Sequence, residues 1–236
     1  MNQSPIASDL HTHTVFSHGK GTPEENVLAA VRLGLKRVAV SEHAAAHVFY
    51  GVRGEKLRSL RREIDRLSAK YARDIEVLMG YECNLTGFGE CDAPKDRAMF
   101  DVLLLAFHKG VPPRDALARS AFREAVGLGR ADPVRVAEAL LAAADKYRID
   151  ILAHPGAYVA ADAATLAKGA AELGVMLEIN SSRVTFTPDE ARLAAALGAR
   201  FCVNSDAHTP SRVGDFAAAI DFANRAGVVV EEWRPR

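Results

Sequence analysis

Histidines and two acids recur at the ends of short apolar segments of this chain. His11 and His13 lie two positions apart in residues 8–14, so in an extended strand both side chains point to the same side. Neutral imidazoles and carboxylates together suit zinc, manganese and iron. The candidate metal ligands are His11, His13, His18, His43, Glu82, His108, His154, Asp206 and His208.

These candidates are spread over the whole chain, so the fold has to bring them together. The carboxyl ends of parallel strands meet at one rim of a barrel or sheet, and sites are built at that rim. A lone His-x-His pair is weak evidence for a metal. Packing all these groups together without an ion would, however, cost several kcal/mol in unpaired polar burial. The sequence therefore predicts a multinuclear metal enzyme.

Three residues near the candidate ligands have different expected roles. His47, the remaining histidine, lies beyond a strand end and is expected to be a solvated loop residue. Cys83 follows Glu82 and points to the opposite side of the strand, as a small core residue would. Asp9 shares a face with His11, so we expect it to accept a hydrogen bond from an imidazole and orient it, with direct ligation as the lesser alternative.

The composition bounds the class of protein. With 236 residues and 49% apolar content the chain can form one α/β barrel, which needs about 250 residues. Lys plus Arg and Asp plus Glu number 30 each, so nothing indicates the basic face that extended nucleic-acid binding needs. The three cysteines lack a Cys-x-x-Cys spacing, which favours a reduced compartment. Without a signal peptide or a run of about 20 apolar residues, the chain is expected to be soluble and cytoplasmic.

Strand and helix signals alternate along the chain, with no linker and one irregular stretch at residues 85–99. Several strand segments are continuously apolar, as parallel strands covered on both faces are. A seven-stranded (β/α) barrel formed by residues 1–236 as one domain fits this pattern best, with a doubly wound open sheet as the alternative. Strands are expected near Ala7, Val38, Val77, Leu103, Ile151, Leu177 and Cys202. Helices are expected after Thr22, Asp132, Asp162 and Thr187, and over residues 57–71 and 215–226.

Six short motifs in this order resemble the PHP (polymerase and histidinol phosphatase) family, and the likeness covers essentially the whole chain. The motifs are Asp-Leu-His-Thr-His-Thr at 9–14, Ser-Glu-His at 41–43, Gly-Tyr-Glu at 80–82, Phe-His at 107–108, Ala-His-Pro-Gly at 153–156 and Ser-Asp-Ala-His at 205–208. The resemblance implies a distorted (β/α)7 barrel with three divalent ions, zinc, manganese or iron, at the carboxyl-terminal rim of its strands. It also implies phosphoester hydrolysis.

The resemblance also implies how the ligands are shared. His11, His13, Glu82 and Asp206 would hold one ion, and Glu82 would bridge to a second ion held by His108 and His154. The third ion would be held by His18, His43 and His208. His18 stands where an aspartate is common in relatives, and a histidine there is typical of the stand-alone phosphatase branch.

A cluster of divalent ions suits phosphate ester hydrolysis. Metals neutralise phosphoryl oxygens, stabilise the leaving alkoxide and lower the pKa of a bound water toward roughly 7. Asp206 is expected to take or orient the proton of the attacking hydroxide, with Glu82 as the bridging carboxylate. The residues expected to contact the substrate are Lys20, Lys109, Asn180 and Arg183.

Three activities compete for such a site. A small-molecule phosphatase, for which histidinol phosphate is one family substrate, is the first. A nuclease or phosphodiesterase would need a basic groove that the balanced charge does not indicate. A metal-dependent amidohydrolase commonly bridges its metals with a strand lysine, whereas this chain has Glu82 at that position. A metal-binding module without activity would leave the open rim unexplained.

Overall fold

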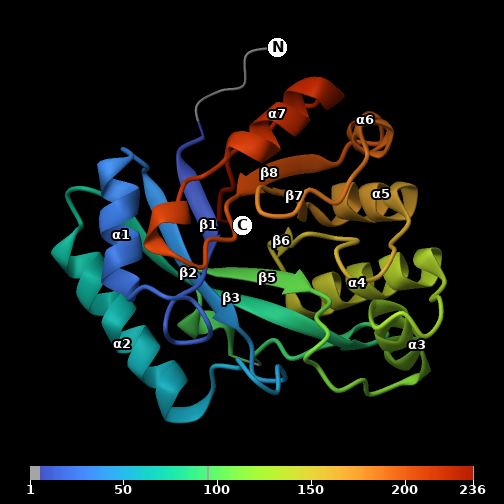
Figure 1. The fold of residues 1–236 in the computed structure, drawn as a ribbon, viewed down its shortest axis with the longest axis horizontal. Helices are drawn as coiled ribbons and strands as arrows, with labels where there is room; N and C mark the ends of the chain where they lie inside the picture. Colours follow the sequence, from blue (N-terminus) through green and yellow to red (C-terminus); the bar gives the residue numbers. More distant parts are fainter. Residues whose placement is uncertain (1–5, 95, 236) are drawn as a thin grey trace.

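The computed structural model describes residues 6–94 and 96–235, and its core is a sheet of parallel strands (Figure 1). These strands lie side by side in the order in which they follow one another in the chain. They are β1 (Ser8–Thr12), β2 (Arg37–His43), β3 (Glu76–Gly87), β5 (Val102–Ala106), β6 (Ile151–Leu152), β7 (Met176–Asn180) and β8 (Arg200–Asn204). A short strand, β4 (Glu90–Cys91), pairs antiparallel with the end of β3.

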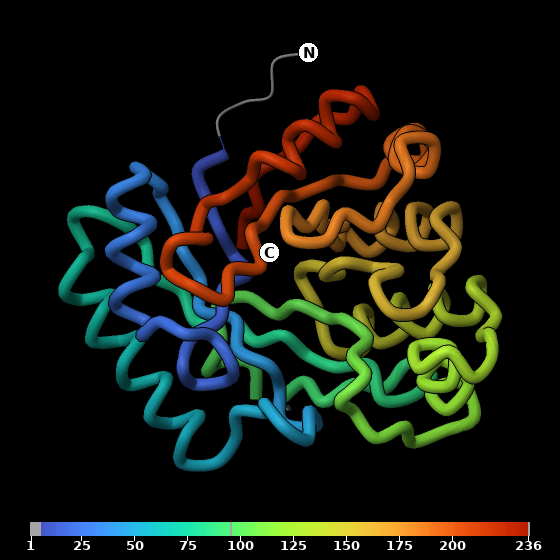
Figure 2. The backbone as a smooth tube through the Cα atoms, in the orientation of Figure 1, coloured from blue at the N-terminus to red at the C-terminus, as the bar shows by residue number. Residues whose placement is uncertain are grey.

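The first and last strands meet, which nearly closes the sheet into a barrel. Thr12 of β1 forms a parallel bridge with Ala207, just beyond β8, and the backbone N–H of His13 donates to the carbonyl oxygen of Ala207 at 2.8 Å. The tube in Figure 2 shows the chain passing around this barrel in sequence order. The predicted distorted (β/α)7 barrel is confirmed. The alternative of a doubly wound open sheet, whose strand order reverses at a switch point, is wrong.

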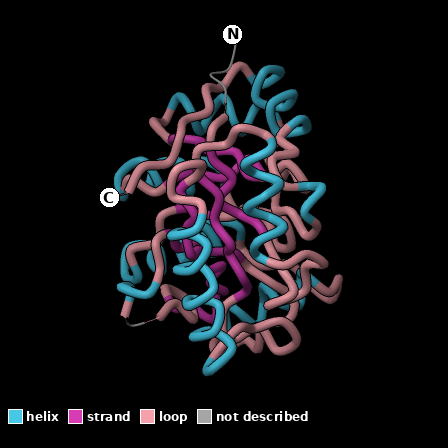
Figure 3. The backbone as a smooth tube through the Cα atoms, turned by 90° about the vertical axis from the view of Figure 1, so that its left-hand side faces the viewer, coloured by secondary structure: helices cyan, strands magenta, loops and turns pink. Residues whose placement is uncertain are grey.

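Helices surround the strands and cover their outer face (Figure 3). Thr22 and Thr187 form capping boxes, in which a glutamate three residues on accepts from the backbone N–H of the threonine. Among the described residues, no helix is both long and apolar enough to cross a membrane. The α-helices are α1 (Pro23–Arg32), α2 (Gly54–Lys70), α3 (Ala116–Ala125), α4 (Pro133–Tyr147), α5 (Ala163–Leu173), α6 (Pro188–Ala196) and α7 (Ala217–Ala226), and the 3-10 turns are η1 (Arg97–Met99) and η2 (Pro210–Arg212).

Two features of the fold differ from the sequence-based prediction. β3 does not end at Glu82 but continues to Gly87, because its end pairs with β4 inside the stretch predicted to be irregular, of which residue 95 lies outside the described residues. Helix α3 is absent from the prediction. Its signal is Asp115, whose carboxylate accepts from the backbone N–H of Ala118 and so caps the helix.

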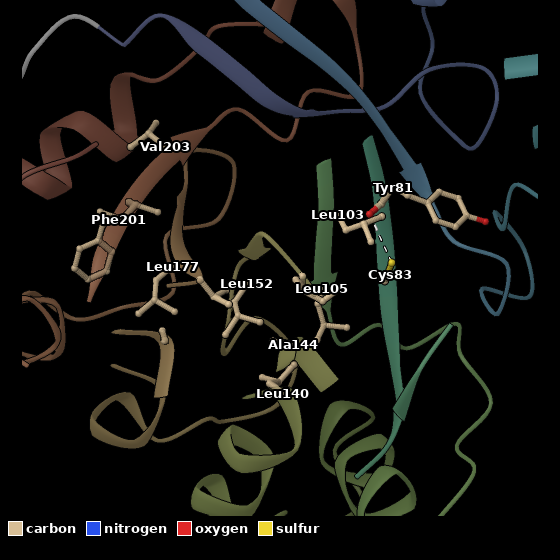
Figure 4. Packing of buried hydrophobic residues seen from close by; sticks show 14 of the residues in the cluster. Tyr81, Cys83, Leu103, Leu105, Leu140, Ala144, Leu152, Leu177, Phe201 and Val203 are labelled. Carbon is tan, nitrogen blue, oxygen red and sulfur yellow. Dashed lines mark hydrogen bonds between the residues drawn. The ribbon is translucent and has the colours of Figure 1, made fainter. Parts of the chain in front are cut away.

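Alternation along the strands divides the buried apolar side chains into two sets. Outward-facing residues such as Leu105, Leu152 and Leu177 pack against the helices, including Leu140 and Ala144 of α4 (Figure 4). The second set fills the inside of the barrel as a separate cluster of Leu10, Ala39, Leu78, Val102, Leu104, Ala106, Ile151, Ala153, Met176, Cys202 and Trp233.

The inside of the barrel changes from apolar to polar along the strands. In β3 the residues of the inward face run from Leu78 through Gly80 to Glu82, and in β7 they run from Met176 to Glu178. Residues two apart share one face of a strand, so both strands change character at the same end. The apolar cluster therefore forms a floor beneath a buried polar layer.

The C-terminal tail closes the amino-terminal end of the barrel. Trp233 is 4% exposed and belongs to the inward cluster. Its carbonyl oxygen accepts from the Arg37 guanidinium at 3.1 Å, at the start of β2. The neighbouring Glu232 accepts from the backbone N–H of Ala7 at 2.7 Å and from the hydroxyl of Ser8. The tail therefore joins the starts of β1 and β2 and completes the apolar floor.

Replacing Trp233 by alanine should lower the free energy of unfolding by about 3–5 kcal/mol, as expected for loss of a large buried aromatic side chain. Val229 lies in the same tail but is 58% exposed, so Val229→Ala should change that free energy by less than about 0.5 kcal/mol. Urea denaturation of both variants measures the difference. Equal effects would show that Trp233 does not pack inside the barrel.

Candidate metal centre

A bulge in β1 aims the first two candidate ligands into the barrel. Asp9 pairs with Val38 and Thr12 pairs with Val40, so residues 10 and 11 lie opposite a single residue of β2. The rings of His11 and His13 are buried, with their centres 5.1 Å apart. The structure thus places this pair on one side of the strand, as their spacing indicates.

Glu82 lies at the centre of the candidate ligands and is 1% exposed. Its two carboxylate oxygens face different groups of imidazoles, which is the arrangement a bridging carboxylate needs. Oε1 lies 3.3 Å from Nε2 of His11, 3.1 Å from Nε2 of His108 and 2.9 Å from Nε2 of His154, and Oε2 lies 2.8 Å from Nδ1 of His43 and 3.6 Å from Nε2 of His13.

Asp206 completes the rim from the end of β8. Its Oδ1 lies 3.3 Å from Nε2 of His13 and 3.6 Å from Nδ1 of His208. Asp206 and His154 both adopt a left-handed backbone, with φ of 52° and 29°. Such conformations cost non-glycine residues of order 1–3 kcal/mol and persist where the surroundings demand them, often at functional sites. Two candidate ligands thus occupy strained backbone positions.

His18 joins the cluster from the loop after β1. Its Nε2 lies 2.8 Å from Nε2 of His208, and its ring centre lies 4.9 Å from that of His43. Burial and the positive charge of nearby His13 lower the pKa of His18 to about 4. Burial also holds the pKa of His43 well below its usual value. Both imidazoles are therefore neutral at pH 7, which is the form that binds metals.

The acids are held in their charged form. Burial alone would raise the pKa of Glu82, but His108, His11 and His43 hold that pKa well below its usual value. Burial likewise opposes ionisation of Asp206, and His11 and His13 hold its pKa well below the usual value. Against the effect of burial, Asp206, Glu42 and Glu82 raise the pKa of His13 to about 9, so the anionic oxygens face both charged and neutral imidazoles in a buried space.

The donor set fits divalent ions. Among the described residues, several buried polar atoms of this cluster form no hydrogen bond, including Nε2 of His11, and Nδ1 of His43 and Oε2 of Glu82, which lie 2.8 Å apart without forming one. Buried polar groups are nearly always paired in native proteins, so these atoms call for another partner. Ligand atoms within 4.8 Å of one another form the groups His11–His13–Glu82, His43–Glu82–His108, His13–His18–His43, His13–Asp206–His208 and His11–His154–Glu178. How these overlapping groups divide among ions stays a prediction.

Glu178, which is not among the site residues predicted from the sequence, orients the cluster from below. Its Oε1 lies 2.9 Å from Nδ1 of His11 and accepts from Nδ2 of Asn204 at 2.9 Å. Its Oε2 accepts from the backbone N–H of His154 at 2.8 Å. By occupying Nδ1 of His11, Glu178 leaves Nε2 to face Glu82 and Asp206, as outer carboxylates do for metal-binding histidines. The sequence contains one signal for this role, namely an acidic residue inside the otherwise apolar start of β7.

Other outer residues act in the same way. The Oδ1 of Asn84 lies 2.7 Å from Nδ1 of His108, which leaves Nε2 of His108 facing Glu82. Glu42 accepts from the backbone N–H of Thr14 at 2.9 Å and so holds the loop that carries His18. These contacts fix ring orientations that no spacing rule reveals.

The expectation that Asp9 orients an imidazole is wrong. Its carboxylate accepts from the backbone N–H of Ser205 at 3.1 Å, from the hydroxyl of Ser205 at 2.5 Å and from the backbone N–H of Gly214 at 2.8 Å. The bulge in β1 turns Asp9 away from the site toward the loop beyond β8. Asp9 therefore positions the chain on either side of Asp206.

A cavity of about 320 Å³ opens above the cluster. Lys109 and Tyr158 line it, with the ammonium of Lys109 5.5 Å from the centre of the Tyr158 ring. The guanidinium of Arg183 lies 4.7 Å from the same ring centre. Lys20 is exposed, and its backbone N–H donates to the carbonyl oxygen of His208 at 2.8 Å. Asn180 is buried among the acids, and Nδ2 donates to Glu178 at 3.0 Å and to Asp206 at 3.2 Å.

The expectation that His47 is solvated is wrong. It is 6% exposed, because the loop after β2 folds back and stacks its ring on that of His43. Cys83 is buried in the outer core, as expected.

The barrel and its cluster of imidazoles and carboxylates define a candidate metal centre of a metal-dependent enzyme. The sequence model of the PHP domain matches residues 9–182. A probable phosphatase of Syntrophotalea carbinolica is 30% identical over 243 residues, covering 95% of this chain and 89% of that protein. A probable phosphatase of Shewanella sp. strain MR-4 is 31% identical over 239 residues, covering 93% and 82%.

A solved structure shares the fold. The crystal structure of histidinol phosphate phosphatase from Lactococcus lactis, complexed with zinc, L-histidinol and phosphate, aligns over 97% of both chains with a TM-score of 0.66 and 17% identity. The chain belongs to the PHP family and is a metal-dependent phosphatase.

Glu178→Gln should weaken metal binding by about 10–100-fold, because an amide does not favour the proton on Nδ1 of His11 as a carboxylate does. Titration of the metal-free protein with zinc measures the dissociation constants. Glu172→Gln on the exposed side of α5 is the matched control and should leave them unchanged. Equal affinities for the two variants would contradict the orienting role of Glu178.

Proposed function

We propose that this protein hydrolyses small phosphomonoesters with three divalent ions, of zinc, manganese or iron, in a single catalytic domain of residues 1–236. The observation that carries the proposal is the cavity of about 320 Å³ directly above Glu82 and Asp206, which has the size of a small-molecule site. Lys109 lines this cavity, and its positive charge suits a substrate that carries a terminal phosphate.

Each ligand set is proposed as the family resemblance gives it. One ion would be held by His11, His13, Glu82 and Asp206, a second by Glu82, His108 and His154, and a third by His18, His43 and His208. Divalent ions held there would neutralise the phosphoryl oxygens, stabilise the leaving oxygen and activate water. The two-sided contacts of Glu82 support its role as the bridging carboxylate.

The protein's own groups would position the reaction. Asp206 faces the cavity, and its carboxylate is placed to act as the general base that takes the proton of the attacking water. The Nδ2 donor of Asn180 holds Oδ2 of Asp206 at 3.2 Å and leaves Oδ1 directed toward His13 and His208. Asn180 would therefore position Asp206. This role replaces the direct contact with substrate that its place at a strand end suggests.

Two cations around one aromatic ring would bind the substrate. Lys109 and Tyr158 line the cavity, and the guanidinium of Arg183 lies over the same Tyr158 ring, although Arg183 itself is not among the lining residues. This pair suits a terminal phosphate or a second anionic group on the substrate. Lys20 does not line the cavity either, and it is exposed, so its proposed contact with substrate has less support than that of Lys109.

The nuclease alternative is less well supported, because the net charge is zero and the cavity is small. Histidinol phosphate remains a candidate substrate, as the Lactococcus lactis protein has L-histidinol and phosphate bound. We also propose a cytoplasmic location, which the three free, buried cysteines support.

Asp206→Asn should lower kcat for a phosphomonoester by about a hundredfold or more, because an amide cannot accept the proton. KM should change less, since the amide keeps the size of the side chain. Steady-state kinetics on the metal-loaded protein measure both constants. Normal kcat combined with a raised KM would contradict this role of Asp206.

A substrate panel tests the proposed function itself. The metal-loaded wild-type protein, which should contain close to three ions per chain by elemental analysis, is expected to hydrolyse small phosphomonoesters faster than diesters or single-stranded DNA. The rates should depend only mildly on salt, since few charges contact the substrate. Arg183→Ala should raise KM and leave the metal content intact. Faster cleavage of DNA than of any monoester would favour the nuclease alternative.

A further inference from the structure

His47 lies in the wall of the cavity, and neither the metal centre nor the proposed mechanism gives it a role. Its ring packs against those of His43, at 4.8 Å between ring centres, and Tyr50, at 4.9 Å, which lie 6.2 Å from each other. Among the described residues, His47 belongs to none of the three-residue groups of potential metal ligands. It is therefore a buried histidine beside the metal centre that is not placed as a ligand.

A backbone hydrogen bond fixes the tautomer of His47. The backbone N–H of Tyr50 points at Nδ1 of His47 at 3.2 Å. Nδ1 must accept this hydrogen bond, so in the neutral imidazole the proton resides on Nε2. Turning the ring over would put a carbon atom opposite the N–H of Tyr50. The remaining nitrogen of His47 is therefore a hydrogen-bond donor.

This donor faces the cavity. Within the described parts of the chain, Nε2 of His47 has no hydrogen-bond partner. It is accessible to solvent, and His47 lines the cavity. The neighbouring wall is formed by Gly110, where a methyl group would lie 2.4 Å from Cε1 and 2.5 Å from Nε2 of His47. Glycine therefore lets the ring edge lie at the cavity surface.

The loop holds the donor in a fixed place. The backbone N–H of Val48 donates to the carbonyl oxygen of Gly110 at 2.8 Å, and the N–H of Gly51 donates to the carbonyl oxygen of His47 at 2.9 Å. Asp92 accepts from the backbone N–H of Ala46 at 2.6 Å. A donor that is already oriented binds an anionic oxygen without further ordering of the protein.

On the basis of the proposed function, we infer that His47 binds the substrate phosphate, with Nε2–H donating to a phosphoryl oxygen. The ring lies next to the candidate ligand His43 and 6.0 Å from the ring of His108, so its donor reaches the space above the metal centre. A neutral donor would orient the phosphate, whereas bound ions and Lys109 would supply the positive charge that attracts it. His47 is then a substrate-binding residue in the loop after β2.

Two substitutions of His47 separate the donor from the packing. In His47→Asn the amide oxygen can still accept from Tyr50, but the side chain is too short to place a donor at the position of Nε2. In His47→Gln the amide nitrogen can occupy that position. Calorimetric titration with inorganic phosphate, on metal-loaded protein, should show affinity falling by about tenfold or more in His47→Asn and mostly kept in His47→Gln.

Further variants guard against a structural explanation. Gly110→Ala should weaken phosphate binding as His47→Asn does, because its methyl group displaces the ring edge. Val48→Ala is the control, since Val48 is 55% exposed and does not line the cavity. Metal content and thermal midpoint should stay unchanged in His47→Asn, and KM for a monoester should rise with the phosphate dissociation constant.

Two outcomes would overturn the inference. Unchanged phosphate affinity in both His47→Asn and Gly110→Ala would show that the donor does not bind phosphate. Loss of bound metal in His47→Asn would show that His47 only supports His43. Failure of the wild-type protein to hydrolyse any monoester would refute the proposed function, whereas its phosphate titration would still decide the role of His47.

Discussion

The buried charge of Glu82 is the constraint on which the site depends. A carboxylate in a protein interior is stable only beside compensating positive charge, because desolvation of an isolated ion costs many kcal/mol. Here five imidazoles lie within 3.6 Å of its oxygens. Nearby acids, acting against burial, raise the pKa of His11 and of His13, so protons on these histidines can supply that charge, and divalent ions bound there would replace the protons. Metal binding and the stability of the upper barrel are therefore linked.

The apolar floor makes this arrangement possible. The inward cluster around Leu104 and Trp233 fills the lower barrel with side chains, so water cannot reach the polar layer from below. Rigid packing there also holds the strand ends, where His154 and Asp206 adopt unfavourable backbone angles. His154 and Asp206 keep these unfavourable backbone angles because packing in the core holds the neighbouring strands in place.

Much of this arrangement could be predicted from the sequence, because ligand type and strand position are local properties. Period-two spacing placed His11 and His13 together, and the alternation of strands and helices predicted the barrel that brings Glu82 and Asp206 to one rim. The hydrogen-bond partners of Glu178 and Asp9 could not be predicted. They depend on the bulge in β1 and on which strand lies across the barrel, and a single sequence contains no signal for either.

The position of His47 shows why the loops limit such predictions most. A histidine beyond a strand end is usually solvated, and nothing in residues 44–47 indicates otherwise. Burial of His47 requires that Gly110, from the loop after β5, has no side chain, and that the backbone of Val48 pairs with it. The barrel core fixes where the candidate metal ligands lie, whereas contacts between neighbouring loops decide which donors face the cavity.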